Sequence, residues 1–193
     1  MIKQLDQLFN TELGRQRDSV GGLPPVHLWD TTLCGDIDIV IDREGRWIHE
    51  GGEIKRAAMV KLFSSLLKRE DGDYFLITPE EKWRIKVAIA PFFIISAQRQ
   101  KRAADQAISL TARTGEVIVI GENNPLWVEP QQDRADSAPL VSVPLVTVRN
   151  GMPGLISRDV FYQLVSWGSV NPATHCLEIE SLGQQFSLGS VDE

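Results

Sequence analysis

Cysteine and histidine are both scarce in this chain. Its 193 residues include only two cysteines, Cys34 and Cys176, and three histidines. The cysteines match neither a CxxC nor a Cys/His zinc spacing, and no two histidines stand four residues apart. We therefore expect neither a metal site nor a cofactor. So few thiols are typical of reducing compartments, and we expect a cytoplasmic protein with two unpaired cysteines.

Long apolar segments are also missing. The longest apolar run, residues 87–95, is interrupted by Pro91. It is far shorter than the roughly 20 residues that a membrane-spanning helix needs. The first 20 residues carry charges throughout and contain no apolar stretch of the kind found in secretion signals. The sequence therefore predicts neither a membrane span nor a secretion signal.

The full chain has a formal net charge of -6, and positive charge is sparse in its second half. Residues 1–115 carry 17 Lys and Arg against 16 Asp and Glu, whereas residues 116–193 carry 3 against 10. An acidic half repels a phosphate backbone, so we expect no nucleic-acid partner.

Motifs of the common nucleotide-binding and hydrolytic sites are absent as well. Neither GGLPP nor GGE has the spacing of a P-loop or a dinucleotide-binding turn, and no serine lies in a GxSxG elbow. Glu80 and Glu81 are explained by a helix-capping box, and Asp36 and Asp38 by a solvated strand face. No residue is therefore assigned a catalytic role.

The N-terminal half combines strands with one helix. Residues 2–9 fit a short helix, and Pro24 and Pro25 favour an extended arm that docks on the fold. Alternating patterns predict strands at IDIVID and KWRIKV. RWIH is expected as the return strand after a hairpin turn at residues 43–45, DYFLIT as the next strand, and TPEE as a single capped helical turn. A helix is expected from Glu53 or Ile54 to near Gly72, because its apolar residues share one side.

The C-terminal half consists mainly of short extended runs. These are FFIISAQ, AISLTA, EVIVIG, PLWVE, PLVTVRN, and a final hairpin of CLEIE and QFSLG, with a polar loop at EPQQDRADSAP. SRDVFYQLVSWG predicts a helix capped by Ser157 and ended by Gly168. Strands without regular helical crossovers indicate an α+β fold with mostly antiparallel sheets. We expect a helix and docking arm over 1–33, an α/β subdomain over 34–91, and a β-rich subdomain with one helix over 92–193.

Several segments resemble a bacterial domain-of-unknown-function family, number 1285 in that series. They are CGDIDIVIDREGRWIHEGG, IKRAAMVKLFSSLLKREDGDYFLITPEEKWRIKV, APFF, NPLWVE, PLVTVRNGMPGLISRDVFYQLVSWG and LGQQFSLG. The resemblance runs in order from about Pro24 to about Gly189, and it implies two small subdomains, an α/β roll and a β roll. It implies no activity. Where the family is expected to carry an acidic pair before the Ala-Pro step, this chain has Ala88 and Ile89.

Arg56 is the residue that bears most on function. On a helical wheel it falls among apolar residues, in the first turn, where a cation opposes the helix dipole. A guanidinium near a core needs a carboxylate or a bound anion beside it. The commoner explanation is an ion pair with Glu81, Asp36 or Asp38.

The alternative is an anion-binding site. Lys82, Arg84 and Lys86 line one face of the strand KWRIKV, and beside Arg56 they would form a cationic concavity with Trp47 and His49 as walls. The predicted ligand-binding residues are Arg56, Lys82, Arg84, Trp47, His49 and Glu81.

Three functions follow. The preferred one is a non-enzymatic binding module for a small anionic ligand or a protein partner, near the seam between the subdomains. The second is an enzyme of unrecognised class that uses Glu81, His49 or Tyr162 with the nearby cations. The third is a structural homodimer that associates through an exposed β edge of the C-terminal part.

Overall fold

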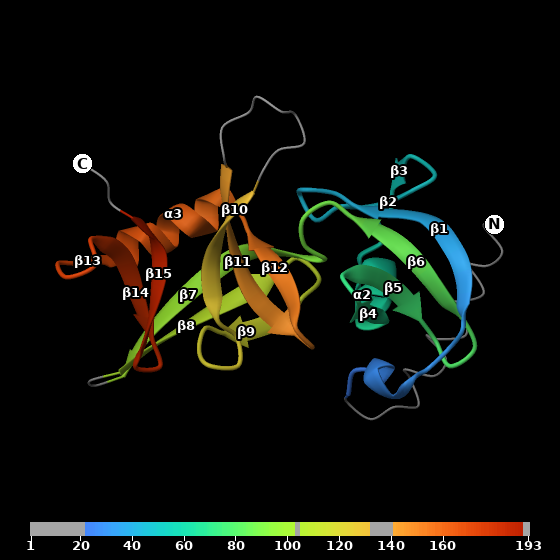
Figure 1. The fold of residues 1–193 in the computed structure, drawn as a ribbon, viewed down its shortest axis with the longest axis horizontal. Coiled ribbons are helices and arrows are strands. Elements are labelled where there is room, and N and C mark those ends of the chain that lie inside the picture. Colours follow the sequence, from blue (N-terminus) through green and yellow to red (C-terminus); the bar gives the residue numbers. More distant parts are fainter. Residues whose placement is uncertain (1–21, 103–104, 132–140, 191–193) are drawn as a thin grey trace. The chain divides into compact units, whose positions relative to one another are not determined.

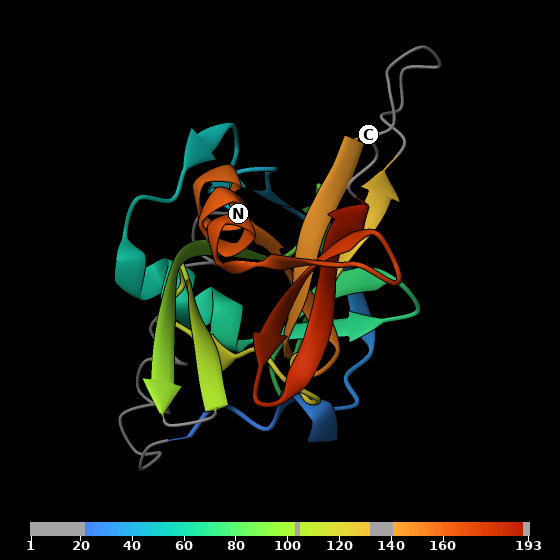
Figure 2. The ribbon, with the colours of Figure 1, turned by 90° about the vertical axis from the view of Figure 1, so that its left-hand side faces the viewer.

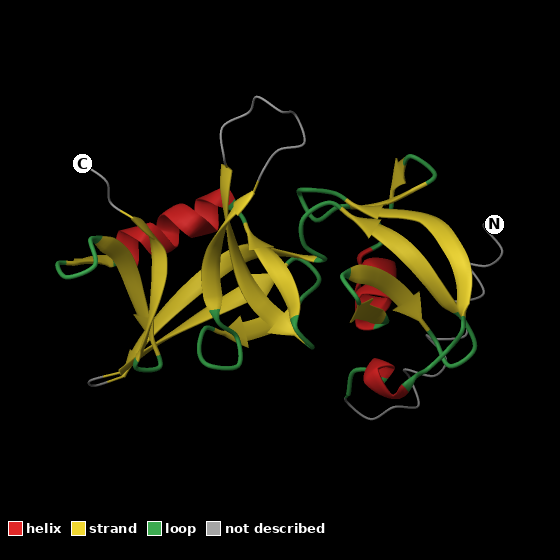
Figure 3. Cartoon of the chain, viewed as in Figure 1, coloured by secondary structure: helices red, strands yellow, loops and turns green. Residues whose placement is uncertain are grey.

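The structure is a computed structural model that describes residues 22–102, 105–131 and 141–190. The chain divides into two compact units, Met1–Ala88 and Ile89–Glu193. Strands outnumber helices in each unit, and each has one α-helix within the described residues (Figures 1 and 3). The helix expected at residues 2–9 lies outside them.

The first unit is built on a six-stranded sheet with the order β3-β2-β1-β6-β5-β4. Its strands are β1 (Leu33–Ile41), β2 (Trp47–His49), β3 (Gly52–Glu53), β4 (Leu67–Glu70), β5 (Asp73–Ile77) and β6 (Lys82–Val87). β1 and β6 run parallel at the centre, and the remaining pairs are antiparallel. The four strands predicted at IDIVID, RWIH, DYFLIT and KWRIKV are all present.

Strand β1 shows why the alternation is informative. Ile37, Ile39 and Ile41 are buried on one face, whereas Asp38 is exposed on the other. This period of two is the expected result for a strand with one face against a core. The predicted turn follows, with Gly45 at a φ of +69°.

Helix α2 (Ala57–Ser65) is much shorter than the predicted helix. It buries Leu62 and Phe63, and the Phe63 ring lies 6.1 Å from that of Trp47, tilted by 32°. The predicted C-terminal end is wrong because residues 67–70 form β4, which pairs with β5 across a turn at Asp71 and Gly72. Both turn residues have positive φ, 50° and 90°, and an Asp-Gly pair of this kind is a strong hairpin signal.

The TPEE segment forms a capped bend and not a helical turn. The Thr78 hydroxyl accepts hydrogen bonds from the backbone N–H groups of Glu80 (3.2 Å) and Glu81 (3.0 Å). The Thr78 N–H donates to the Glu81 carbonyl at 2.8 Å, and the chain then enters β6. The capping role of Thr78 is therefore confirmed, but the predicted helical turn is wrong.

The described part of the N-terminal arm contacts the first unit, and it is not extended throughout. It contains a short 3₁₀ helix, η1 (Val26–Leu28), and Val26 is only 2% exposed. Two hydrogen bonds also hold the arm. Lys68 Nζ donates to the Trp29 carbonyl at 2.7 Å, and the Thr31 hydroxyl donates to the Thr78 carbonyl at 2.8 Å.

The second unit contains a six-stranded sheet with the order β10-β11-β12-β7-β8-β9 and a three-stranded sheet with the order β13-β14-β15. The strands are β7 (Phe92–Arg102), β8 (Asp105–Ala112), β9 (Val117–Val119), β10 (Leu126–Gln131), β11 (Val141–Arg149), β12 (Met152–Ile156), β13 (Ser169–Asn171), β14 (Cys176–Ser181) and β15 (Gln184–Ser190). Only β12 and β7 pair in parallel among the named strands of this unit.

Strand β12 was not predicted, because Pro153 and Gly154 argue against a strand. The glycine has a packing reason. A Cβ at Gly154 would lie 2.8 Å from Val148 Cγ2, so only glycine lets the neighbouring strand approach this closely.

Helix α3 (Arg158–Trp167) confirms its prediction at both ends. The Ser157 hydroxyl accepts from the Val160 N–H at 3.4 Å, and Gly168 is the C-cap. Val160 and Leu164 are buried, and Figure 2 shows the helix nearly end-on with the β14–β15 hairpin beside it.

The α+β class with mostly antiparallel strands is therefore confirmed. Neither described helix combines the length and the apolarity that crossing a bilayer requires.

Candidate functional site

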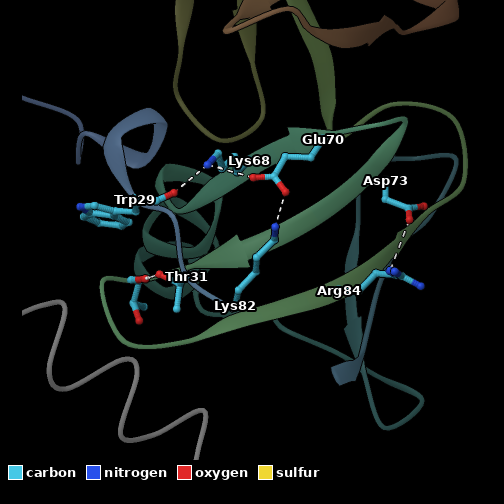
Figure 4. A network of polar contacts seen from close by, with 8 residues as sticks. Trp29, Thr31, Lys68, Glu70, Asp73, Lys82 and Arg84 are labelled. Carbon is cyan, nitrogen blue, oxygen red and sulfur yellow. Dashed lines mark hydrogen bonds and ion pairs between the residues drawn. The ribbon is translucent and has the colours of Figure 1, made fainter. Parts of the chain in front are cut away.

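Two lysines share one carboxylate on the sheet of the first unit (Figure 4). Lys68 and Glu70 come from β4, and Lys82 comes from β6. Lys68 Nζ lies 2.9 Å from Glu70 Oε1, and Lys82 Nζ donates to Glu70 Oε2. The side chains of Lys68 and Lys82 are 19% and 13% exposed, so both are largely covered. We refer to Lys68, Glu70 and Lys82 as the clasp.

The clasp holds its carboxylate ionised. Hydrogen bonds from Lys82 and Lys68 lower the pKa of Glu70 below its ordinary value, and they outweigh burial, which acts in the opposite direction. The clasp also reaches the N-terminal arm, because Lys68 donates to the Trp29 carbonyl. It therefore ties the arm to two strands of the sheet.

Arg84 extends this set of charges along β6. Its Nε lies 3.4 Å from Asp73 Oδ2, and its Nη1 lies 3.9 Å from Asp36 Oδ1. Lys82 and Arg84 both lie beside the ring of Phe75, at 4.5 and 5.7 Å from its centroid. A cation is attracted to the face of an aromatic ring, so these contacts stabilise both side chains where they lie. Carboxylates of the same unit therefore already accompany Lys82 and Arg84, two of the cations that the sequence assigned to an anion site.

Arg56 does not lie where the helical wheel placed it. It is the N-cap of α2, has an extended backbone conformation, and is exposed. The reason is the later start of the helix: β3 occupies residues 52–53, and the Ile54 N–H donates to the Trp47 carbonyl at 2.7 Å. The expectation that Arg56 intrudes on an apolar surface is wrong.

The start of α2 has an unusual composition. The side chain of its N-cap residue, Arg56, makes no capping hydrogen bond, and its first turn contains no acidic residue. Lys55 and Arg56, which immediately precede it, are both exposed. The first N–H groups of a helix have no partner within the helix, and the dipole makes this end positive. The two cations add to that positive potential.

The remaining predicted site residues are dispersed. Trp47 is 1% exposed and packs against α2, so it is part of the core and not a surface wall. His49 Nδ1 lies 2.7 Å from the Asp38 carbonyl oxygen. Glu81 accepts from Trp83 Nε1 at 3.2 Å, and the exposed Tyr162 belongs to α3 of the second unit. Lys86 is exposed on β6.

The described residues include no group of three or more His, Cys, Asp and Glu side chains that could hold a metal ion. Cys34 and Cys176 are free thiols.

Sequence reasoning missed a covered cation in the second unit, Arg149. Its side chain is 11% exposed, lies 3.9 Å from Glu116, and covers the buried ring of Phe92 with its guanidinium carbon 5.2 Å from the centroid. Burial lowers the pKa of Arg149, and Glu116 partly offsets this effect. The Thr114 hydroxyl donates to Glu116. The position of Arg149, between an alternating strand and the Asn-Gly turn at 150–151, could have drawn attention to it.

Two family models match the chain. Residues 24–90 match "Domain of unknown function (DUF1285), N-terminal domain", and residues 91–188 match "Protein of unknown function (DUF1285), C-terminal domain". No curated protein matches it.

Two solved structures are similar to this chain. A DUF1285 family protein from Silicibacter pomeroyi is 38% identical, with a TM-score of 0.79, and the match covers 90% of this chain and 91% of that one. A DUF1285 family protein from Shewanella baltica is 24% identical, with a TM-score of 0.49, and the match covers 67% of this chain and 91% of that one.

Proposed function

The chain belongs to the DUF1285 family, and we propose that it is a cytoplasmic binding module and not an enzyme. Two free thiols support a reducing compartment. The groups suggested for catalysis have other contacts: Glu81 accepts from Trp83, and His49 contacts a backbone carbonyl. The shifted pKa of Glu70 belongs to an ion-paired carboxylate within a structural clasp, which favours a module over a catalytic site.

We propose that the ligand is a small anion held at the start of helix α2. The observation that carries this proposal is the combination of an uncapped helix start, a first turn without acids, and exposed Lys55 and Arg56. Backbone N–H groups and the positive end of the dipole favour a phosphate or carboxylate group there. Arg56 is suited to a bidentate contact with such a group.

In this proposal Lys82 and Arg84 support the sheet and do not contact the ligand. Their charges face Glu70, Asp73 and Asp36, so an incoming anion would meet carboxylates as well as cations. Trp47 holds the segment that leads into α2, because its carbonyl accepts from the N–H of Ile54.

The test is a thermal-shift series with inorganic phosphate and small carboxylates on the full chain. We expect phosphate to raise the Tm of the wild type and to have a smaller effect on Arg56→Met. Lys61→Met is the matched control: it removes an exposed positive charge from the middle of the same helix. It should keep most of the response.

Equal responses in wild type and Arg56→Met would overturn the anion proposal. An equal loss in Lys61→Met would mean that only general charge matters. Mass spectrometry of small molecules released from the purified protein would identify a ligand that co-purifies.

An exposed edge strand supports a second candidate, a symmetric homodimer. β9 is the last strand of its sheet, and Val117 and Val119 are 67% and 39% exposed. Edge strands with exposed apolar side chains are templates for pairing. We propose that two copies pair β9 antiparallel to β9, with the two-fold axis near Ile118, as a closed isologous interface requires.

The charge pattern suits a second copy as the partner. The strand register places Ser96, Thr111 and Val117 in one row across β7–β9, and Gln98, Ser109 and Val119 in the next. None of these side chains ionises at neutral pH. Two chains that each carry a net charge of -6 repel each other, so an uncharged face costs least to bring together.

Light scattering after gel filtration tests this candidate. The wild type should have the mass of a dimer, and Val119→Lys should shift it to a monomer. Val170→Lys is the control, because Val170 is 51% exposed on a different edge strand, β13. A monomeric wild type, or a Val119→Lys variant that stays dimeric, would contradict the interface.

A further inference from the structure

Two buried polar atoms lie on the core-facing side of β2. The register pairs Trp47 with Ile41 and His49 with Ile39, and both isoleucines are 0% exposed. Residues two apart on a strand share a face. Trp47 Nε1 and His49 Nε2 are both buried, and neither has a hydrogen-bond partner among the described residues.

The geometry around His49 determines which ring nitrogen carries the proton. Nδ1 lies 2.7 Å from the Asp38 carbonyl oxygen, and because a carbonyl only accepts, Nδ1 must donate. The pairing of β1 with β2 ends at Ile39 and His49, since the chain turns away at Glu50 and Gly51 with φ values of 48° and 76°. The Asp38 carbonyl therefore accepts from the His49 ring, where a longer β2 would have supplied a backbone N–H. In a neutral ring with the proton on Nδ1, Nε2 is an acceptor.

Trp47 supplies the complementary group. The indole N–H is a donor only, and the residue is 1% exposed between the sheet and Phe63 of α2. A buried donor and a buried acceptor on one strand face each carry a desolvation penalty that a shared partner would remove.

We propose that Trp47 Nε1–H and His49 Nε2 bind one neutral, water-sized molecule, and that this molecule is an internal water. Two residues of a strand span about 6.6 Å. One oxygen that makes two hydrogen bonds of about 2.9 Å joins atoms at most about 5.8 Å apart, so the proposal requires the two long side chains to lean toward each other. The molecule must both accept from the indole and donate to the imidazole, and water does both. The surrounding isoleucine and phenylalanine side chains give an ion no compensation.

The test is NMR on the full wild-type chain with labelled indole and imidazole nitrogens. We expect the Trp47 indole proton to show a cross-peak to water with opposite signs in NOE and ROE spectra, which marks a long-lived water. The His49 spectrum should show a protonated Nδ1 and a bare Nε2. Trp83 is the internal control, because its Nε1 donates to Glu81 and it should show no such water contact.

A double-mutant cycle tests the same link energetically. Trp47→Phe and His49→Leu each leave one polar partner without its bridge, so the double variant should lose less Tm than the sum of the two single variants. His49→Gln should restore part of the loss, because its amide can still accept.

The proposal is overturned if the indole proton contacts a protein acceptor and not water. Additive losses of Tm, or a His49 ring protonated at Nε2, would overturn it as well. If the variants fail to fold, the cross-peak in the wild type still decides.

Discussion

Helix α2 of the first unit and helix α3 of the second are similar in length but differ at both ends. α3 starts at Ser157, whose hydroxyl caps it, has Asp159 in its first turn, and stops at Gly168. α2 starts at Arg56 without a side-chain cap, has no acid in its first turn, and passes through Leu66 directly into β4. Local sequence signals therefore define α3, whereas packing against the sheet and the pairing of β4 with β5 define α2.

Removing the main packing contact of α2 should have the largest effect. Phe63→Ala should lower the free energy of unfolding by about 3–5 kcal/mol, because it leaves a cavity beside Trp47. Chemical denaturation followed by tryptophan fluorescence measures this loss. Lys61→Ala, an exposed change in the same helix, should shift it by less than about 0.5 kcal/mol. Similar losses in both variants would contradict a helix held by packing.

The clasp next to the C-terminal end of α2 should come second. Glu70→Gln should cost on the order of 1–2 kcal/mol, since two ammonium groups lose their carboxylate. The folded-state pKa of Glu70 is lowered, so its contribution is full above the unfolded value and is lost as pH falls from 4.5 through the lowered pKa. Unfolding curves at neutral and acidic pH should therefore converge for wild type and Glu70→Gln at low pH. A constant difference would exclude the ionised carboxylate as the cause.

Cap substitutions should have opposite signs in the two helices. Ser157→Ala should destabilise the protein by about 1 kcal/mol, because the Val160 N–H loses its acceptor. Arg56→Ser should stabilise it by about the same amount, because it supplies the missing acceptor at α2. Ser166→Ala serves as a control, since Ser166 lies exposed inside α3. If both cap substitutions changed the free energy of unfolding in the same direction, the two helix starts would not differ in side-chain capping.

First-turn charge should have the smallest effect. Asp159→Asn should cost about 0.3–1 kcal/mol, and Ala58→Asp should gain a similar amount, both through the helix dipole. Both effects should shrink in high salt, which denaturation at two ionic strengths would show. Salt-independent values would point to hydrogen bonding as the cause.

The sequence predicted what strict local rules determine. Alternation located β1 and β6, and the cap and stop residues located α3 at both ends. α2 was overextended because its apolar periodicity continues into LLKRE, whereas the Asp71-Gly72 turn folds these residues into a hairpin. Strand β12 was missed because Pro153 and Gly154 oppose a strand on propensity alone.

The candidate site was less predictable because burial depends on tertiary contacts. The predicted helix began too early, and this placed Arg56 in its first turn among apolar residues. In the structure Arg56 is the N-cap and is exposed. Arg149 is a largely covered guanidinium beside Phe92 and Glu116, and the pairing of its strand with β12 is irregular between Thr147 and Arg149. A one-dimensional pattern shows neither that irregularity nor the carboxylate across the sheet.

Glu70 pairs with two lysines, so the three residues of the clasp should differ in how well they tolerate substitution. If Lys68 or Lys82 changes, the carboxylate keeps the other ammonium, so each lysine has a substitute already in place. If Glu70 changes, both ammonium groups lose their common partner at once. The ion pairing of the clasp should therefore be buffered against variation at either lysine but not at the acidic position, whereas the hydrogen bond from the clasp to the N-terminal arm comes from Lys68.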